Sequence, residues 1–117
     1  VATSKPEIYA KKILDYYELS NYFYYIAGAN MDGTRTDKAE VIAYALKQIP
    51  AEYNNKKVLM VGDRSHDIIG AKKNGIDCAG VLFGYGSREE LEEAGADFVA
   101  DSVEAVRNIV FLNAAKN

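Results

Sequence analysis

Short apolar runs alternate with amphipathic segments along the chain, which is the pattern of an α/β domain with a mostly parallel sheet. The apolar runs predict strands at Val1–Thr3, Tyr24–Ala27, Lys57–Val61, Cys78–Leu82 and Asp97–Ala100. The amphipathic segments predict helices at Lys5–Leu19, from the cap Thr36 to Pro50, at Asp67–Lys73, from the cap Ser87 to Gly95, and at Val103–Leu112. No second domain is indicated, so residues 1–117 are interpreted as one domain.

Local signals set the expected ends of these elements. Ser4 with Glu7, and Ser87 with Glu90, have the spacing of a capping box, in which each side chain binds the other residue's backbone N–H. The strand at Lys57–Val61 is expected to be buried. The glycines of the segment 84–86 predict a flexible loop.

Composition narrows the class of partner. The 14 Lys and Arg residues are outnumbered by 17 Asp and Glu, for a net charge of -3. The sequence therefore has no basic footprint for nucleic acid or anionic lipid, and a small molecule is the expected partner. No stretch approaches the roughly 20 apolar residues of a membrane span, and no signal peptide is recognised at the start.

The single cysteine, Cys78, lies in an apolar run and cannot build a disulfide framework. A lone cysteine is typical of a reducing compartment, so a cytoplasmic location is expected. The chain opens at Val1, without Met and inside a predicted strand, and we expect it to be a fragment of a longer protein.

The most specific motif is the hexapeptide Gly62-Asp63-Arg64-Ser65-His66-Asp67, directly after the apolar strand that ends at Val61. Ligands of open α/β sheets bind beyond the carboxyl ends of strands, and paired carboxylates are the hard oxygen donors that Mg²⁺ prefers. The hexapeptide therefore predicts that Asp63 and Asp67 bind a metal ion. The alternative is that both carboxylates only cap the following helix.

Two further positions fit an anion. Thr3 and Ser4 lie where a strand is expected to pass into a helix, so a hydroxyl and free backbone N–H groups could face one phosphate. Lys38 opens another helix, where the helix dipole disfavours a cation unless an anion is bound. Ordinary capping by Thr3 and Ser4, and a solvated surface lysine at 38, are the competing interpretations.

Other candidates are assigned no catalytic role. Asn30-Met31-Asp32-Gly33-Thr34 is interpreted as a turn built on Asp-Gly. His66 is interpreted as a solvent-facing residue, and Arg35 and Arg64 as cations that could steer a phosphate without being required. The acidic side chains of the fourth predicted helix are interpreted as a solvated face: Glu89, Glu90, Glu92 and Glu93.

In chain order, the hydroxyl after one strand, the lysine that opens a later helix and the G-D-x-x-x-D after the next strand resemble the haloacid-dehalogenase-type (HAD) phosphatases. The segments 1–6 and 62–72 look most like the phosphoglycolate-phosphatase-like branch. The resemblance covers essentially the whole chain. It implies a three-layer, Rossmann-like core with a mostly parallel sheet.

The resemblance also implies roles. Thr3, with Ser4, would bind a phosphoryl oxygen, and Lys38 would neutralise the phosphoryl group and the nucleophile. Asp63 would bind Mg²⁺ with support from Asp67. A complete protein of this kind is a Mg²⁺-dependent phosphomonoester hydrolase that acts on a small phosphorylated metabolite.

The family's first motif, D-x-D-x-[TV] after an N-terminal strand, is absent from the chain. That motif supplies the nucleophile, the acid/base and further metal ligation, and its strand lies between those that end at Thr3 and Gly62. A helical cap inserted before the second motif would be absent too. We therefore expect an N-terminal segment from the same gene product or from another chain. The alternative function is a non-catalytic module that binds phosphate and metal without turnover.

Overall fold

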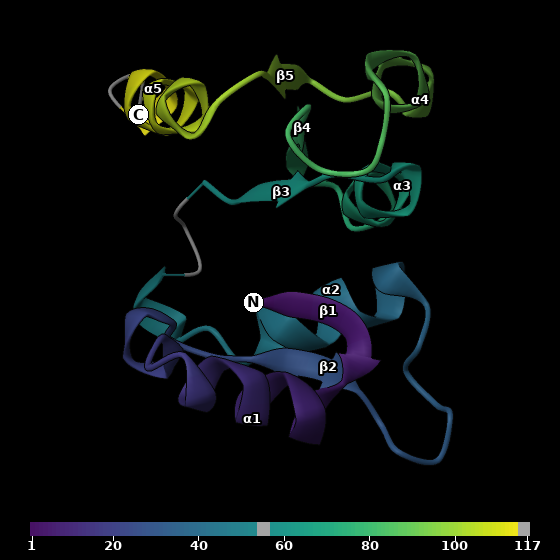
Figure 1. Ribbon diagram of the computed structural model, residues 1–117, viewed down its shortest axis with the longest axis vertical. Coiled ribbons are helices and arrows are strands. Elements are labelled where there is room, and N and C mark those ends of the chain that lie inside the picture. The colour runs from purple at the N-terminus through teal and green to yellow at the C-terminus, as the bar shows by residue number, and fades with distance from the viewer. Residues whose placement is uncertain (54–56, 115–117) are drawn as a thin grey trace. The chain divides into compact units, whose positions relative to one another are not determined.

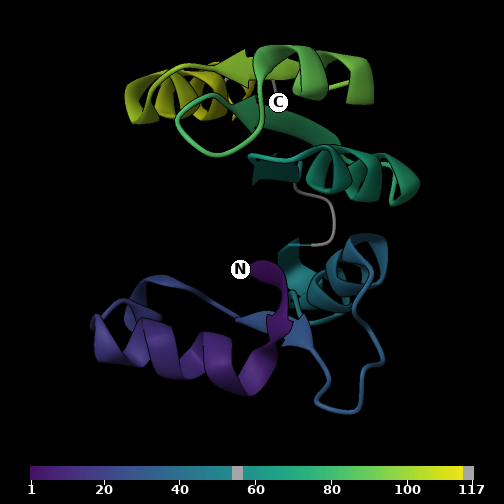
Figure 2. The same ribbon diagram turned by 45° about the vertical axis from the view of Figure 1, so that its right-hand side comes forward.

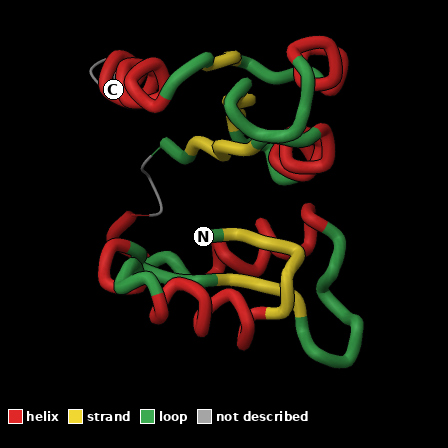
Figure 3. Tube along the Cα trace, in the orientation of Figure 1, coloured by secondary structure: helices red, strands yellow, loops and turns green. Residues whose placement is uncertain are grey.

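The computed structural model describes residues 1–53 and 57–114, which fall into two compact units, Val1–Lys56 and Lys57–Asn117. Each unit has a small parallel sheet with helices packed against it (Figure 1; Figure 2). Figure 3 shows strand and helix alternating along both units. The predicted α/β class with parallel strands is confirmed.

The first unit pairs two parallel strands, β1 (Ala2–Pro6) and β2 (Ala27–Ala29). Helix α1 (Glu7–Tyr16) follows β1 directly, and α2 (Lys38–Lys47) follows β2 after a loop. Two short 3-10 turns complete the unit, at Ser20–Tyr22 and Ala51–Tyr53. Its buried apolar side chains come from α1, β2, α2 and the residue before β2: Ala10, Ile26, Ala27, Ala29, Val41 and Ile42.

The second unit holds three parallel strands in the order β3-β4-β5. The strands are β3 (Leu59–Gly62), β4 (Asp77–Val81) and β5 (Phe98–Ala100). The helices are α3 (Ser65–Lys73), α4 (Arg88–Ala94) and α5 (Val103–Ala114). Because the strands are parallel, the loops that follow β3 and β4 emerge at the same edge of this sheet. That edge carries the hexapeptide.

The first helix begins later than predicted, at Glu7, with Pro6 at its N-cap position and no side-chain cap. The Lys5–Leu19 boundary and the capping box of Ser4 with Glu7 are therefore wrong. A proline disfavours helical backbone in the residue before it, so Lys5 stays extended and β1 continues to Pro6. Ser4 consequently lies within a strand.

The second strand and second helix are also shifted. The strand occupies the small residues Ala27–Ala29, whereas the aromatic Tyr24 at the predicted start is exposed. A Cβ at Gly28 would lie 2.6 Å from the Cα of Glu7, so only glycine allows this strand and helix to approach so closely. Asp37, not Thr36, caps α2, because its carboxylate accepts a hydrogen bond from the Ala39 N–H at 3.2 Å.

Strand β3 is confirmed in position but is not buried as predicted, since Val61 is 41% exposed. Within the described residues β3 pairs with β4 alone, which leaves its other side without a neighbouring strand. The other boundaries in this unit agree closely with prediction. Asn74 ends α3, and Gly95 ends α4 in the left-handed conformation at φ 97°.

Across the described residues, no helix combines the length and apolar character that crossing a bilayer requires.

Leu91 lies at the centre of the hydrophobic core of the second unit. Its side chain is fully buried and clusters with Ile68, Ala71 and Cys78. Leu91→Ala is therefore expected to lower the free energy of unfolding by about 3 kcal/mol, from lost burial and the cavity left behind. Denaturant unfolding followed by circular dichroism measures the change. Leu112→Ala deletes the same atoms from a residue that is 66% exposed, and it should cost less than about 0.5 kcal/mol. Equal losses in the two variants would contradict the assignment of this core.

Candidate functional site

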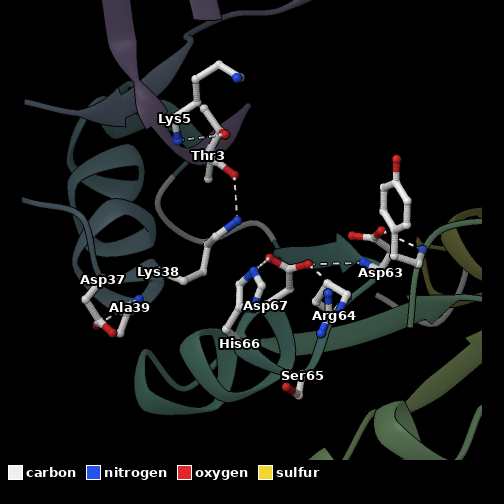
Figure 4. A network of polar contacts seen from close by, with 12 residues as sticks. Thr3, Lys5, Asp37, Lys38, Ala39, Asp63, Arg64, Ser65, His66 and Asp67 are labelled. Carbon is white, nitrogen blue, oxygen red and sulfur yellow. Dashed lines mark hydrogen bonds and ion pairs between the residues drawn. The ribbon is translucent and has the colours of Figure 1, made fainter. Parts of the chain in front are cut away.

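The hexapeptide covers the last residue of β3, the turn after it and the first three residues of α3, and Asp67 holds this turn in place. Asp67 is 4% exposed, and its Oδ2 accepts hydrogen bonds from the backbone N–H groups of Asp63 at 3.1 Å and Arg64 at 3.2 Å (Figure 4). Two N–H groups that precede the first helical turn are thereby satisfied. The alternative that Asp67 caps the following helix is therefore confirmed for its Oδ2 atom. The same contacts fix the backbone on which Asp63 stands.

Gly62 makes this arrangement possible. A Cβ at residue 62 would overlap the side chain of Asp67. The glycine before the first aspartate is therefore required by the close approach of the second aspartate. The spacing of the motif is a steric requirement as well as a pattern of carboxylates.

Asp63 is held from the other side by the loop that follows β4. Its Oδ2 accepts a hydrogen bond from the Tyr85 N–H at 2.9 Å, and its backbone carbonyl accepts one from the Gly86 N–H at 2.9 Å. A Cβ at Gly84 would overlap the Asp63 side chain, and one at Gly86 would overlap the Asp63 carbonyl. The prediction of a flexible loop is therefore wrong, because these glycines allow the loop to pack tightly against Asp63.

Gly84→Ala is expected to push the loop off Asp63 and to weaken divalent-cation binding by about tenfold, the usual effect of disturbing a group that orients a ligand. Mn²⁺ titration followed by electron paramagnetic resonance measures the affinity. Tyr85→Ala is the control, because it removes a side chain that is 92% exposed and keeps the backbone N–H. If Gly84→Ala binds Mn²⁺ as the unmodified protein does, the loop does not position Asp63.

Glu90, in α4, also holds this turn, a role that the sequence interpretation missed. Its Oε2 accepts hydrogen bonds from Arg64 Nε at 2.9 Å and from the Ser65 N–H at 2.8 Å. The Arg64 guanidinium and the Ser65 N–H hold the pKa of Glu90 below its usual range. The interpretation of Glu90 as part of a solvated face is therefore wrong.

The capping box that flagged Glu90 is confirmed in one half only. Ser87 accepts the Glu90 N–H at 3.1 Å, as predicted, whereas the Glu90 carboxylate turns to the hexapeptide instead of the Ser87 N–H. The spacing of Ser87 and Glu90 was a signal that Glu90 binds backbone, but it could not reveal a partner far away in the sequence.

His66 stands beside the acidic pair. Its side chain is 58% exposed, as the solvent-facing interpretation expected, and its Nε2 lies 3.8 Å from Asp67 Oδ1. Figure 4 shows the imidazole next to the Asp67 carboxylate.

In the first unit, Lys38 is the first residue of α2 and its side chain reaches β1. The Lys38 Nζ donates to the Ala2 carbonyl at 3.5 Å and is partly buried (Figure 4). The interpretation of Lys38 as a freely solvated lysine is therefore wrong. Lys38 is placed beside the strand that carries Thr3 and Ser4.

Thr3 and Ser4 are not at a helix start, as predicted, because α1 begins only at Glu7. The Thr3 Oγ1 accepts a hydrogen bond from the Lys5 N–H at 3.2 Å, and Ser4 is exposed. The two hydroxyls therefore lie on strand β1 and not at a helix N-terminus. The proposed contact of Thr3 and Ser4 with phosphate stays a prediction.

Arg35 has a structural position. Its Nε donates to the Gly28 carbonyl at 2.9 Å, its Nη2 lies 3.8 Å from Glu7 Oε1, and its guanidinium covers the Tyr44 ring at 3.7 Å. The Tyr44 hydroxyl, 2.9 Å from that of Tyr25, raises the pKa of Tyr25 to about 12. These contacts join α1, β2 and α2.

The turn that contains Asp32-Gly33 is confirmed. Asp32 Oδ1 accepts hydrogen bonds from the Thr34 N–H at 3.0 Å and the Thr34 hydroxyl at 2.6 Å, and Gly33 has φ 88°. These bonds lower the pKa of Asp32. The Asp32 carboxylate is therefore used within its own turn.

The donor set suits a hard cation in part. Asp63 and Asp67 supply carboxylate oxygens, the class of ligand that Mg²⁺ prefers. Within residues 1–53 and 57–114, no group of three or more His, Cys, Asp or Glu side chains is arranged to hold a metal ion. The acidic turn, by which we mean the hexapeptide from Gly62 to Asp67, therefore fits part of a Mg²⁺ coordination shell, to which further ligands or waters would have to be added.

Known proteins match this chain over most of its length. A 5'-nucleotidase of Pseudomonas aeruginosa is 38% identical over 94% of this chain and 49% of its own. The tyrosine-protein kinase PtkA of Mycobacterium tuberculosis is 42% identical over 85% of this chain and 33% of its own. A crystal structure of a predicted phosphatase from Clostridium acetobutylicum has a TM-score of 0.85 and 41% identity, over 95% of this chain and 50% of that one.

The chain thus spans about half the length of the nucleotidase and of the crystallised protein, and a third of the kinase. The HAD-hydrolase-like family matches residues 35–106, which include Lys38, the acidic turn and the loop that supports it. The chain belongs to the HAD-hydrolase-like family.

Proposed function

We propose that the complete protein is a Mg²⁺-dependent phosphomonoester hydrolase of the phosphoglycolate-phosphatase-like type. The observation that carries the proposal is the acidic turn at the carboxyl end of β3, where Asp67 and the loop after β4 fix Asp63 through backbone hydrogen bonds. Family membership supports the hydrolase class. Two carboxylates held rigidly in this way are suited to a cation.

In this proposal Asp63 binds Mg²⁺, and Asp67 supports it by orienting the turn. Mg²⁺, when bound, supplies positive charge that stabilises the phosphoryl oxygens and the attacking group. Asp63 is suited to direct binding because one of its carboxylate oxygens is oriented by the Tyr85 N–H at 2.9 Å. Asp67 is suited to a supporting role because its Oδ2 is committed to two backbone N–H groups.

Lys38 and Thr3 have the phosphate-binding roles, with Ser4 beside Thr3. A lysine neutralises a phosphoryl group as a point charge, and a threonine hydroxyl donates one hydrogen bond to it. The Lys38 ammonium lies at the strand that carries both hydroxyls, 3.5 Å from the Ala2 carbonyl. We propose that a bound phosphoryl group takes the Lys38 ammonium as its partner.

The nucleophile is proposed to be a carboxylate of the N-terminal segment, from the same gene product or from another chain. A carboxylate nucleophile divides hydrolysis into two steps: attack on phosphorus, which breaks the ester P–O bond and releases the alcohol, and transfer of the phosphoryl group to water, which frees the carboxylate and gives inorganic phosphate. The strand that carries it is proposed to pair beside β3, which pairs with β4 alone within the described residues.

The substrate is proposed to be a small phosphorylated metabolite in the cytoplasm, and a nucleoside monophosphate is a close variant. The similarity to a 5'-nucleotidase supports this variant. Net negative charge disfavours a nucleic acid as partner, and the buried lone Cys78 suits a reducing compartment.

The alternative function is a non-catalytic module that binds phosphate and metal. This function would apply if no N-terminal segment supplied a nucleophile. The chain itself offers no substitute, because Asp32 is the only carboxylate in a sequence like the first motif and its side chain is held within its own turn.

Phosphate release from an aryl phosphate by the complete gene product tests the proposal. Turnover with Mg²⁺ that stops with a chelator and returns when Mg²⁺ is restored supports it. Chelator-resistant turnover, or cation and phosphate binding without turnover, overturns it, and the latter result supports the non-catalytic module.

A further inference from the structure

The Glu90 carboxylate reaches from α4 to the start of α3, where it accepts hydrogen bonds from Arg64 and Ser65. The distances are 2.9 Å to Arg64 Nε and 2.8 Å to the Ser65 backbone nitrogen, and the Glu90 side chain is 29% exposed. The neighbouring ion pair of α4, between Arg88 and Glu92, joins two residues of one helix across solvent. Glu90 differs from that pair, because it joins α4 to the acidic turn.

Arg64 lies within the acidic turn, directly after Asp63. In the sequence Arg64 lies between Asp63 and Asp67. If its guanidinium turned toward these two carboxylates, it would compete with a metal ion for them. The ion pair with Glu90 keeps the guanidinium on another carboxylate. The pKa of Arg64 is raised first by Glu90 and to a smaller extent by the charges of Asp63 and Asp67, so all three acids act on this one cation.

We propose that Glu90 is a positioning residue for the cation site: it holds Arg64 away from Asp63 and Asp67 and leaves their carboxylates to the metal ion. This inference rests on the proposed function, because it concerns the same acidic turn. Glu90 itself acts through Arg64 and does not bind the cation. Its hydrogen bond to the Ser65 N–H fixes the carboxylate in the place where it holds the guanidinium.

Mn²⁺ titration of the complete protein, followed by electron paramagnetic resonance, tests the inference without relying on activity. Glu90→Gln keeps the shape and a hydrogen-bond acceptor but removes the charge that holds Arg64. It is expected to weaken Mn²⁺ binding about tenfold, the scale found for groups that orient metal ligands. Glu89→Gln removes the same charge from an exposed residue of the same helix turn and should leave the affinity unchanged.

Removing Arg64 distinguishes this role from general support of the fold. The double variant Arg64→Gln with Glu90→Gln is expected to regain the affinity of the unmodified protein to within about threefold, because the competing cation is gone. Arg64→Gln alone should bind Mn²⁺ at least as tightly as the unmodified protein. This single variant keeps the test valid if Glu90→Gln does not fold.

Each outcome decides the inference. Unchanged Mn²⁺ affinity in folded Glu90→Gln overturns it, as does a double variant that binds as weakly as Glu90→Gln, and so does weakened binding in Arg64→Gln. If the unmodified protein binds Mn²⁺ and hydrolyses the ester while Glu90→Gln behaves identically, the inference fails and the proposed function stands. If the unmodified protein neither binds Mn²⁺ nor hydrolyses the ester, both are overturned.

Discussion

Asp63→Asn in the complete protein is expected to reduce Mg²⁺-dependent phosphate release about a thousandfold, on the order of 4 kcal/mol in transition-state stabilisation. The asparagine keeps the size of the side chain and an oxygen that can accept the Tyr85 N–H, so the loop after β4 can stay in place. What it removes is the negative charge that would hold the cation. Steady-state rates with an aryl phosphate at several Mg²⁺ concentrations measure the loss.

Asp77→Asn is the matched control for this change. Asp77 begins β4, at the end of the sheet opposite to the acidic turn, and its carboxylate lies 3.6 Å from the Lys57 ammonium on the surface. Removal of this charge should leave kcat and the Mg²⁺ dependence unchanged, since exposed ion pairs contribute little. Normal Mg²⁺-dependent activity in Asp63→Asn would contradict the metal-binding role.

Lys38→Met is the second substitution with a large expected effect. Methionine keeps an unbranched apolar side chain but removes the ammonium group, which is proposed to neutralise the phosphoryl group. We expect kcat to fall about a hundredfold, a typical loss when one group that stabilises transition-state charge is removed. Steady-state kinetics with the aryl phosphate give kcat and KM separately.

Lys47→Met removes the same charge from the last turn of the same helix, where the side chain is exposed. It should retain the unmodified kcat, because its side chain lies at the opposite end of α2 from Lys38. Equal activity in Lys38→Met and Lys47→Met would show that position 38 has no special role.

Much of the fold could be predicted because its signals are local. The parallel α/β pattern follows from the alternation of apolar and amphipathic segments, and the cap Ser87 and the terminating Gly95 follow from backbone chemistry within one helix. Pro6 was the local signal that the interpretation underused, since it excludes Lys5 from the helix. The position of β2 depended on the approach of Gly28 to Glu7, which is a tertiary contact.

The candidate site also has one part that local sequence predicts and one part that depends on tertiary contacts. Asp63 and Asp67 are four residues apart in one turn, so their proximity could be predicted from sequence. The bonds that hold Asp63 from outside the turn come from the N–H groups of Tyr85 and Gly86. Glu90 holds the intervening Arg64 and Ser65, and nothing in the spacing of the hexapeptide indicates any of these partners. The glycines at 84 and 86 looked like a flexible loop because the close approach of Asp63, which requires glycine there, arises only in the folded unit.

We propose that this chain carries the phosphate-binding and metal-binding residues of a HAD-type phosphatase, while the nucleophile lies outside it. The most direct measurement compares Mg²⁺-dependent hydrolysis of an aryl phosphate by the native gene product and by the 117-residue chain, with the intact mass of each. We expect a heavier native protein that hydrolyses the ester and a 117-residue chain that does not. Hydrolysis by the 117-residue chain at the native rate, or an inactive native protein of the same mass, would contradict it.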